Sequence, residues 1–215
     1  MLQHPVLPCR LMSGDEIGIV VLAAGAGTRF GGGKLLADLQ GRPMLQHVLD
    51  AVREVAPGRC VVVMGADAPL IETRIDWRDE VRVVNTAPAA GLASSLRVGV
   101  ATCLDLQPGI TGIMVVLGDQ PRTSADVMRT LIDAVPAAQA AGAWAVVPRY
   151  ALGGGNNPAL LLGDALARVP DLEGDRGMGA LLAANPSRVH AVDVPGANPD
   201  VDTRADLAAL ASGAP

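Results

Sequence analysis

The sequence predicts one α/β domain, a three-layer sandwich in which a mostly parallel sheet is covered by helices on both faces. Short apolar runs alternate with amphipathic segments from residue 17 to the end of the chain, and this alternation is typical of parallel βαβ units. Half of the 215 residues are hydrophobic but only 2% are aromatic, so small side chains must pack the helices closely against a buried sheet. We therefore predict a single domain over residues 17–215. Residues 1–16 show no periodicity and are expected to form a flexible extension.

The predicted elements follow one another along the chain. Segments rich in apolar residues predict strands over residues 17–22, 60–64, 81–84, 113–117, 144–147 and 189–194. The first is a continuous apolar run, and those over 60–64 and 81–84 are expected to be buried. Apolar residues at helical spacing predict helices over residues 43–55, 92–101, 124–141, 161–169, 178–184 and 204–211. Ser124 is expected to cap its helix, and Pro136 to kink that helix or end it early. Because ligands of such sheets bind at the carboxyl ends of the strands, the residues just after each apolar run are the functional candidates.

Composition excludes several classes of protein. The net charge of −5 and the scarcity of aromatic residues do not suit a nucleic-acid-binding surface. Cys9, Cys60 and Cys103 are scattered, which argues against a disulfide framework or a zinc site. The longest apolar stretch, residues 17–26, is too short to span a bilayer. We expect a cytoplasmic protein with neither a nucleic-acid nor a membrane partner.

A glycine-rich loop directly follows the first predicted strand. Five glycines fall within residues 25–33, and Arg29 and Lys34 add two positive charges. Successive backbone N–H groups in such a loop can cradle phosphate oxygens. A flexible turn is the alternative, but a turn alone does not require five glycines and two cations. As a loop residue, Lys34 is expected to lie outside the core, so that its replacement leaves the fold intact.

A carboxylate ends the strand predicted over residues 113–117. Asp119 would be costly to bury without a partner, and a magnesium ion bridging nucleotide phosphates is one such partner. A cap on the following helix is the alternative, but Ser124 is better placed for that role. If the carboxylate is uncompensated without metal, Asp119→Asn should change stability little or even raise it.

Two more aspartates stand near the end of the chain. In an extended segment Asp200 and Asp202 point to the same side, while Val201 points away. The two carboxylates therefore suit a metal site. The equally weighted alternative is that Asp202 or Thr203 only caps the helix over residues 204–211.

These residues resemble the molybdenum cofactor nucleotidyltransferases, specifically their cytidylyltransferase branch. Residues 22–34 match the signature L-A-A-G-x-G-x-R-x-G-x-x-K of that family, residues 118–121 its G-D-Q-P motif, and residues 200–206 its D-x-D-T-x-x-D element. The resemblance covers residues 17–210 and implies a Rossmann-like nucleotidyltransferase fold. It also implies that the glycine loop grips a triphosphate and that Mg²⁺ is the metal. The implied nucleotide-binding residues are Leu22, Ala23, Ala24, Gly25, Gly27, Arg29, Lys34, Ser94 and Ser95. Arg29, Lys34 and Asp119 would be catalytic, and the implied metal ligands are Asp119, Asp200 and Asp202.

Further segments resemble the family around the base and the acceptor. Ser94 and Ser95 open a predicted helix in a segment like the family's G-x-x-x-S-L, although Ser94 could be an ordinary first-turn residue. Asn157 and Pro158 lie in a segment like G-x-P-x-L, and Asp175 lies in one like the G-D-x-G loop. Both are implied to bind the acceptor, or they are plain turns.

The resemblance implies transfer of CMP from CTP to the terminal phosphate of molybdopterin, with a molybdenum hydroxylase as a candidate client. Two rivals remain. The chain could use GTP or another small phosphorylated acceptor, although the sugar-phosphate branches usually carry a proline before their lysine, where this chain has Gly33. It could also be a chaperone that binds molybdenum cofactor without turnover.

Overall fold

The computed structural model describes residues 16–25, 27–55, 60–175 and 177–212. Apart from Glu16, the extension predicted over residues 1–16 lies outside the described residues. None of the helices within these ranges is long and apolar enough to cross a membrane.

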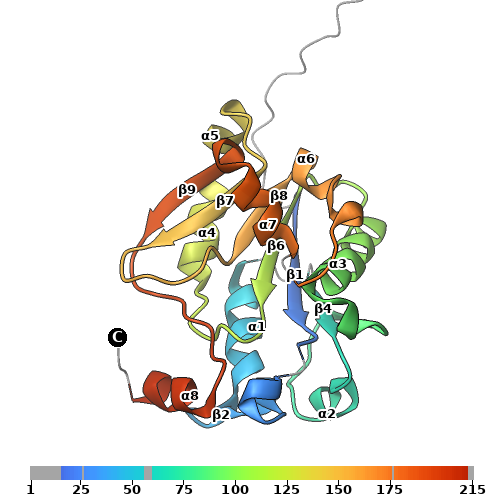
Figure 1. Cartoon of the computed structure of the whole chain (residues 1–215), viewed down its shortest axis with the longest axis vertical. Helices are drawn as coiled ribbons and strands as arrows, with labels where there is room; N and C mark the ends of the chain where they lie inside the picture. The colour runs from blue at the N-terminus through green and yellow to red at the C-terminus, as the bar shows by residue number, and fades with distance from the viewer. Residues whose placement is uncertain (1–15, 26, 56–59, 176, 213–215) are drawn as a thin grey trace, which may run out of the picture.

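A seven-stranded sheet forms the middle layer, in the order β5-β4-β1-β6-β8-β7-β9 (Figure 1). Its strands are β1 (Ile17–Ala23), β4 (Cys60–Met64), β5 (Val81–Val84), β6 (Gly112–Leu117), β7 (Ala145–Tyr150), β8 (Ala159–Leu162) and β9 (Val189–Val194). Of these, β8 runs antiparallel to both of its neighbours, and the other neighbouring pairs are parallel. A separate two-stranded ladder joins β2 (Asp38–Leu39) to β3 (Arg42–Pro43). The predicted class, a mostly parallel sheet between helices, is confirmed.

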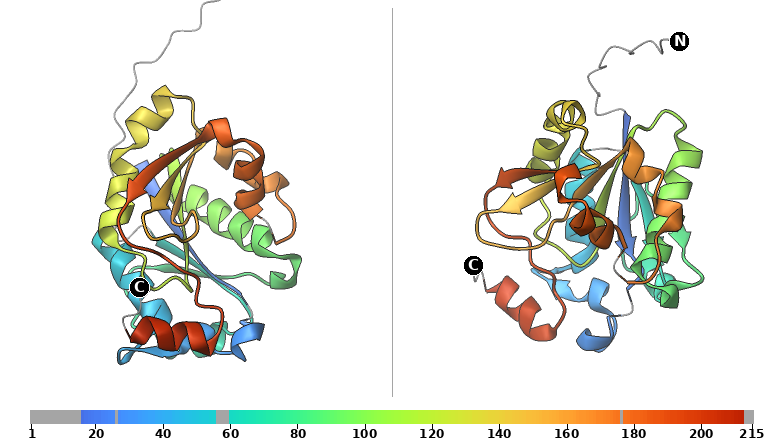
Figure 2. Two further views of the ribbon diagram at one scale, coloured as in Figure 1. Left: turned by 60° about the vertical axis from the view of Figure 1, so that its left-hand side comes forward. Right: turned by 45° about the horizontal axis from the view of Figure 1, so that its top comes forward.

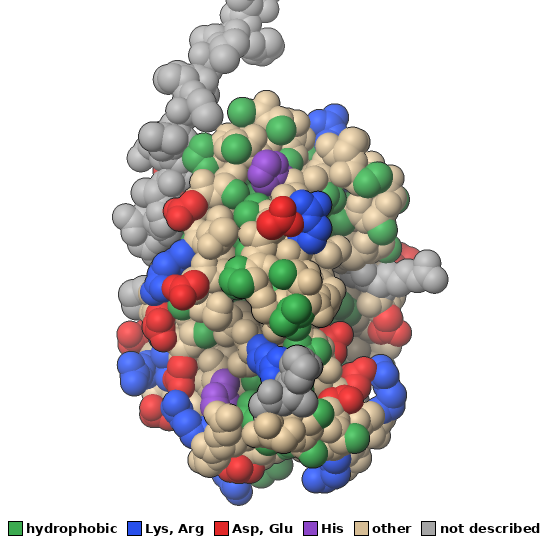
Figure 3. Space-filling model, turned by 90° about the vertical axis from the view of Figure 1, so that its left-hand side faces the viewer, with side chains coloured by type: hydrophobic (Ala, Val, Ile, Leu, Met, Phe, Trp, Pro, Cys, Tyr) green, Lys and Arg blue, Asp and Glu red, His purple; other side chains and the backbone are tan. Residues whose placement is uncertain are grey.

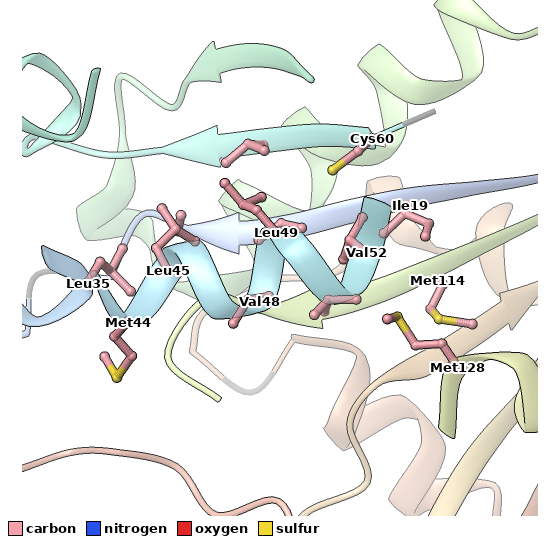
Figure 4. Packing of buried hydrophobic residues seen from close by; sticks show 14 of the residues in the cluster. Ile19, Leu35, Met44, Leu45, Val48, Leu49, Val52, Cys60, Met114 and Met128 are labelled. Carbon is pink, nitrogen blue, oxygen red and sulfur yellow. The ribbon is translucent and has the colours of Figure 1, made fainter. Parts of the chain in front are cut away.

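Helices cover both faces of this sheet (Figures 1 and 2). The α-helices of the described residues are α1 (Met44–Val55), α2 (Ala68–Glu72), α3 (Leu92–Leu106), α4 (Ala125–Asp133), α5 (Val135–Ala140), α6 (Gly163–Leu166), α7 (Gly177–Ala184) and α8 (Arg204–Ala211), of which α8 lies at one end of the molecule. Alternate residues of β1 belong to different hydrophobic layers: Ile19 packs with α1 and α4, whereas Val20 packs with α3. Figure 4 shows Leu49 and Val52 of α1 packed beside Ile19 in the first of these layers. Both faces of β1 and β4 are buried, as their unbroken apolar runs predict. The edge strand β5 is mostly exposed, so the burial expected over residues 81–84 is wrong, because an edge strand has a neighbour on one side only.

Two glycines let α3 approach the sheet closely. A methyl group on Gly99 of α3 would lie 2.4 Å from a methyl carbon of Val20. A methyl group on Gly18 of β1 would lie 2.4 Å from the sulfur of Cys103, which is a buried free thiol, as is Cys60. No side chain larger than hydrogen fits at this helix–sheet contact.

One predicted helix is wrong. The helix expected over residues 161–169 is instead β8 followed by the single-turn helix α6. Ala159–Leu162 is a short, wholly apolar run, and such a run has no periodicity that separates a buried strand from a buried helix. Its place is decided by the sheet, where β8 fills the gap between β6 and β7.

Other expectations hold with shifted boundaries. The predicted break at Pro136 is confirmed, because α4 ends at Asp133 and α5 begins at Val135. Ser124 caps α4 by accepting a hydrogen bond from the N–H of Val127. Pro43 lies in β3 rather than in the helix, which begins at Met44, and α3 extends to Leu106.

Candidate active site

The candidate residues gather at the carboxyl ends of two adjacent parallel strands. Leu22 of β1 is paired with Leu117 of β6, and the N–H of Gly118 donates to the carbonyl of Leu22 at 2.9 Å. The glycine loop leaves β1 here, and the Asp119 turn leaves β6. Figures 1 and 2 show the glycine loop and α8 together at this end of the molecule.

The glycine loop is a folded element. Its residues form two short 3₁₀ turns, η2 (Thr28–Phe30) and η3 (Lys34–Leu36). The loop bends at glycines with positive φ, including Gly27 at 55° and Gly33 at 64°, where other residues would be strained. Phe30 is 3% exposed and anchors the loop in the core. The loop therefore holds the side chain of Lys34 in one direction.

Lys34 points inward between two carboxylates. Its ammonium donates to Asp119 Oδ2 at 2.7 Å and to Asp202 Oδ1 at 3.1 Å, and the residue is only 8% exposed. Burial works against the charge, but the two carboxylates outweigh it and hold the pKa of Lys34 above its ordinary value. The expectation that Lys34 lies outside the packed interior is wrong, because these carboxylates draw it in. The expectation of an uncompensated Asp119 is wrong for the same reason.

Arg29 completes the charged cluster from the solvent side. Its guanidinium lies 2.8 Å from Asp202 Oδ2, and its side chain is 76% exposed. Asp202 thus contacts both cations of the loop. On the face shown in Figure 3, basic and acidic side chains are interspersed rather than segregated.

The segment before α8 shows whether Asp202 caps that helix or belongs to the charged site. Thr203 is the N-cap of α8 and forms a capping box with Asp206, so Asp202 is not needed as a cap. Val201 is 1% exposed, and its N–H donates to the carbonyl of Asp119 at 3.2 Å. Val201 therefore lies in the core, and the carboxylate of Asp202 contacts the two cations of the loop.

Asp200 lies beside this pair of carboxylates. Its Oδ1 accepts a hydrogen bond from Gln120 Nε2 at 2.8 Å. Partial burial raises the pKa of Asp200, the bond from Gln120 lowers it, and the negative charges of Asp119 and Asp202 raise it, so that the net shift is upward. Such crowding of like charges favours binding of a cation.

The carboxylates of Asp119, Asp200 and Asp202 are chemically suited to bind a divalent cation. Carboxylate oxygens are the ligands that Mg²⁺ and Mn²⁺ prefer. Within the described ranges, no three His, Cys, Asp or Glu side chains form a preformed metal cage. Mg²⁺ is commonly held by one or two carboxylates together with water and substrate phosphates, so Asp119, Asp200 and Asp202 suit a metal that binds with a nucleotide.

Ser94 and Ser95 lie in the first turn of α3 and face the interior. Both hydroxyls accept hydrogen bonds from Asn85 Nδ2, at 2.7 and 3.0 Å. Ser94 Oγ also lies 2.9 Å from the carbonyl oxygen of Gly91. The two side chains are 5% and 4% exposed. In this conformation their hydroxyls organise the start of the helix, and contact with a base stays a prediction.

A mostly apolar cavity of about 520 Å³ lies between the sheet and helices α3 and α7. Leu22 and Leu117 line it from the sheet, Leu96 from α3, and Met178 from α7, with Asn157 among its polar lining residues. Pro158 follows Asn157 through a cis peptide bond and is buried. The loop carrying Asp175 packs on the start of α3, where the carbonyl of Gly174 accepts from the N–H of Ala93 at 3.1 Å. Of the predicted acceptor residues, Asn157 therefore lines the cavity, whereas Pro158 and Asp175 are not among its lining residues.

Sequence reasoning missed three buried polar residues: Asn85, Gln120 and Asn198. Asn85 directly follows β5, and Gln120 follows Asp119 in the G-D-Q-P motif, so position after a strand was an available signal. Asn198 lies in an irregular segment, and no local pattern marks it.

The fold is that of the nucleotidyltransferases. Residues 19–200 match the MobA-like NTP transferase domain, and the chain belongs to that family.

Three known proteins illustrate the likeness. The chain is 36% identical over 121 residues to the bifunctional protein GlmU of Cupriavidus metallidurans, which covers 55% of this chain and 26% of GlmU; the match thus spans about a quarter of that relative. Rv0371c of Mycobacterium tuberculosis is 30% identical with a TM-score of 0.77, covering 94% of this chain and 100% of that one. A second structure of Rv0371c, in complex with manganese, is 30% identical with a TM-score of 0.75 and covers 92% and 98% of the two chains.

The third protein shares the fold alone. Molybdopterin-guanine dinucleotide biosynthesis protein A of Archaeoglobus fulgidus is 17% identical with a TM-score of 0.60, covering 91% of this chain and 97% of that one.

Proposed function

We propose that the protein transfers CMP from CTP to the terminal phosphate of molybdopterin, releases pyrophosphate and depends on Mg²⁺. The observation that carries the proposal is the placement of Lys34 between Asp119 and Asp202, with Arg29 on Asp202. The strands that lead to this cluster also contribute Leu22 and Leu117 to a cavity of ligand size. The same end of the sheet thus offers positive charge for phosphates, carboxylates for a metal and room for an acceptor.

The glycine loop would hold the triphosphate. In the nucleotide complex we expect Lys34 Nζ to exchange its carboxylate partners for phosphate oxygens, and Arg29 to neutralise charge on the departing pyrophosphate. The backbone N–H groups of Gly25 and Gly27 would donate to the same oxygens. Such positioned charges act mainly where negative charge develops in the transition state.

The metal would be held by Asp119 with Asp200 and Asp202. A bound Mg²⁺ supplies charge neutralisation and orientation of the α-phosphate. The manganese complex of Rv0371c supports a divalent cation in a relative of this chain.

The acceptor would enter the cavity near Asn157. Its terminal phosphate is already ionised at pH 7, so no strong general base is needed. An acceptor oxygen forms a bond to the α-phosphorus of CTP as the bond between the α- and β-phosphates breaks, and pyrophosphate leaves with that electron pair. The protein's contribution is in-line positioning and charge neutralisation. A cytoplasmic location and a molybdenum hydroxylase client complete the proposal.

Ala24 would favour CTP over GTP. The guanylyl branch of the family usually has glycine at this position, and the added methyl group narrows the slot for a purine. One methyl group is worth about 1–3 kcal/mol, or roughly 10–200-fold in kcat/KM. Equal kcat/KM values for CTP and GTP, or a higher value for GTP, would assign the protein to the guanylyl branch instead.

Pyrophosphate release with CTP, Mg²⁺ and molybdopterin tests the reaction, with mass spectrometry of the product. We expect release only when all three are present, together with a cytidylylated pterin. Tight binding of molybdopterin without pyrophosphate release supports the chaperone alternative. Turnover with a sugar phosphate and not with molybdopterin supports a different acceptor.

A further inference from the structure

Asn198 is a buried hub that joins three segments of the chain. It is 0% exposed, and its Nδ2 lies 3.2 Å from each of three acceptors: Gln120 Oε1, Thr123 Oγ1 and the carbonyl oxygen of Asn157. Its Oδ1 finds no hydrogen-bond partner among the described residues. The buried amide of Asn198 thus has an oxygen without a hydrogen bond and an NH₂ group that faces three acceptors, and this arrangement needs an explanation.

The Asn157 carbonyl determines which way this amide points. A backbone carbonyl can only accept a hydrogen bond, so the atom of Asn198 that faces it must be the NH₂ group. Tyr150 also donates its hydroxyl proton to this carbonyl, at 3.1 Å, which holds the Asn157 backbone in place.

The orientation passes from Asn198 to a second amide. Because Asn198 donates to Gln120 Oε1, the NH₂ group of Gln120 must point the other way, and it donates to Asp200 Oδ1 at 2.8 Å. Gln120 is itself 1% exposed, so water does not compete freely for these bonds. The result is a directed relay from the Asn157 carbonyl through Asn198 and Gln120 to a carboxylate of the site.

We propose that Asn198 and Gln120 are positioning residues that hold the Asp200 carboxylate in place to bind the divalent cation together with the nucleotide. The proposal rests on the proposed function for the identity of the site. The relay engages one oxygen of Asp200 and restrains its rotation, which lowers the entropy lost when the cation binds. It also connects the metal side of the site to Asn157 at the cavity. Outer-shell bonds of this kind are typically worth roughly 10–100-fold in metal affinity.

The test is Mn²⁺ binding to the purified full-length protein with CTP present, measured from the free Mn²⁺ signal in electron paramagnetic resonance. Gln120→Met keeps the volume of the side chain and removes the donor to Asp200, while Asn198 keeps its other two acceptors. We expect the Kd for Mn²⁺ to rise roughly 10-fold or more. Thr123→Val is the matched control, since it removes another partner of Asn198 that does not lead to Asp200, and its Kd should stay within about twofold of wild type.

Asn198→Asp tests the direction of the relay. An ionised carboxylate at this position can only accept, so Gln120 must turn its NH₂ group toward it and present its oxygen to Asp200. We expect weaker Mn²⁺ binding, although added negative charge alone would strengthen it. Tighter binding by Asn198→Asp overturns the proposal.

If Gln120→Met binds Mn²⁺ with wild-type affinity, the proposal is also overturned. A purely structural role of Gln120 predicts this unchanged affinity together with a loss of stability in thermal unfolding. Absence of Mn²⁺ binding by the wild type also overturns the proposal. Mn²⁺–CTP binding needs no acceptor. A wild type that binds Mn²⁺ but transfers no CMP to molybdopterin therefore defeats the proposed function and leaves the relay standing.

Discussion

Lys34 has two roles: it pairs with carboxylates in the structure, and it is proposed to bind phosphate. It neutralises Asp119 and Asp202 in the free protein, and its charge is the one proposed to hold phosphate. A buried ammonium is costly unless it is paired, so the two carboxylates explain its position in the absence of nucleotide. The side chain of Arg29 is 76% exposed, so water can solvate its charge and it does not need a paired carboxylate.

Replacing Lys34 should therefore affect both activity and stability. Lys34→Met should lower kcat/KM for CTP by about 10²-fold or more. It should also lower the free energy of unfolding by roughly 1–3 kcal/mol, because charge-assisted bonds are lost and the two carboxylates are left facing each other. Steady-state kinetics and urea unfolding measure the two effects. Arg42→Met, which removes an exposed ion pair with Asp50, is the control and should change neither by much. A Lys34 variant with normal use of CTP would contradict the assignment of the loop.

Asp119→Asn tests the other side of the same pair. Activity should fall by orders of magnitude and recover poorly with added Mg²⁺, since a catalytic charge is lost. Stability should fall by about 1–2 kcal/mol, because the bond at 2.7 Å to Lys34 loses its ionic character. Thermal unfolding and a Mg²⁺ titration of the rate report these changes. A rise in Tm would mean that Asp119 is not compensated in the free protein.

At the scale of elements, α3 depends on a glycine where it crosses β1. Gly99→Ala should lower stability by roughly 1–3 kcal/mol, because the new methyl group would lie 2.4 Å from Val20 and 2.9 Å from Val63, both buried. Gly179 in α7 is the matched control, since nothing lies within 4 Å of a methyl group there. Gly179→Ala should raise stability by up to about 1 kcal/mol through helix propensity. Chemical unfolding of both variants checks the opposite signs; equal effects would show that close packing at Gly99 does not matter.

A buried ion pair ties α1 to the start of β5. Glu80 accepts from Arg53 Nε at 2.5 Å and from the N–H of Arg78 at 2.7 Å. Burial alone would raise the pKa of Glu80, but these two donors outweigh it and bring the pKa below the ordinary value of 4.5. The pair therefore stabilises the fold fully above about pH 4.5, and its contribution is lost as pH falls through the lowered pKa.

Glu80→Gln should cost about 1–3 kcal/mol at pH 7, because the charge-assisted bond to Arg53 becomes one to a neutral amide, although Arg53 keeps its ion pair with Asp50 at 3.0 Å. The difference from wild type should narrow as the pH falls below 4.5. Urea unfolding at several pH values gives both results. Asp193→Asn, in the exposed pair with Arg149, should have no measurable effect. A constant difference at all pH values would exclude the ionised Glu80 as its source.

At the scale of the whole molecule, nucleotide and metal should stabilise the fold together. The loop after β1, the turn after β6 and the segment before α8 meet only in the folded state, so a ligand that contacts all three binds the native chain alone. At 100 times its Kd such a ligand adds about 2.7 kcal/mol, or roughly 5–10 °C in Tm for a chain of this size. CTP with Mg²⁺ should show this shift, and CTP with a chelator should show little of it. An equal shift without metal would mean that the carboxylates take no part in binding.

Much of this molecule follows from local pattern. A buried strand can be recognised as an unbroken apolar run, and for this reason β4 has the predicted boundaries. The boundaries of β5 and β9 also match the prediction, because both are rich in valine, which favours strands. The glycine loop and Asp119 are recognisable because many glycines lower stability and a carboxylate at the end of a buried strand is costly without a partner. Such residues at the end of a strand indicate a binding site. Asp200 and Asp202 are recognisable because the alternation of an extended chain depends on the backbone alone.

Tertiary structure decided the rest. The run over 159–162 is compatible with helix or strand, and pairing with β6 and β7 makes it β8. The burial of Lys34 depends on carboxylates 85 and 168 residues away. The relay through Asn198 joins it to residues 78 and 41 positions away in the sequence. Electrostatic and hydrogen-bond energies depend on distances in space, which local sequence does not specify, whereas the alternation of apolar residues depends on neighbours along the chain, which it does.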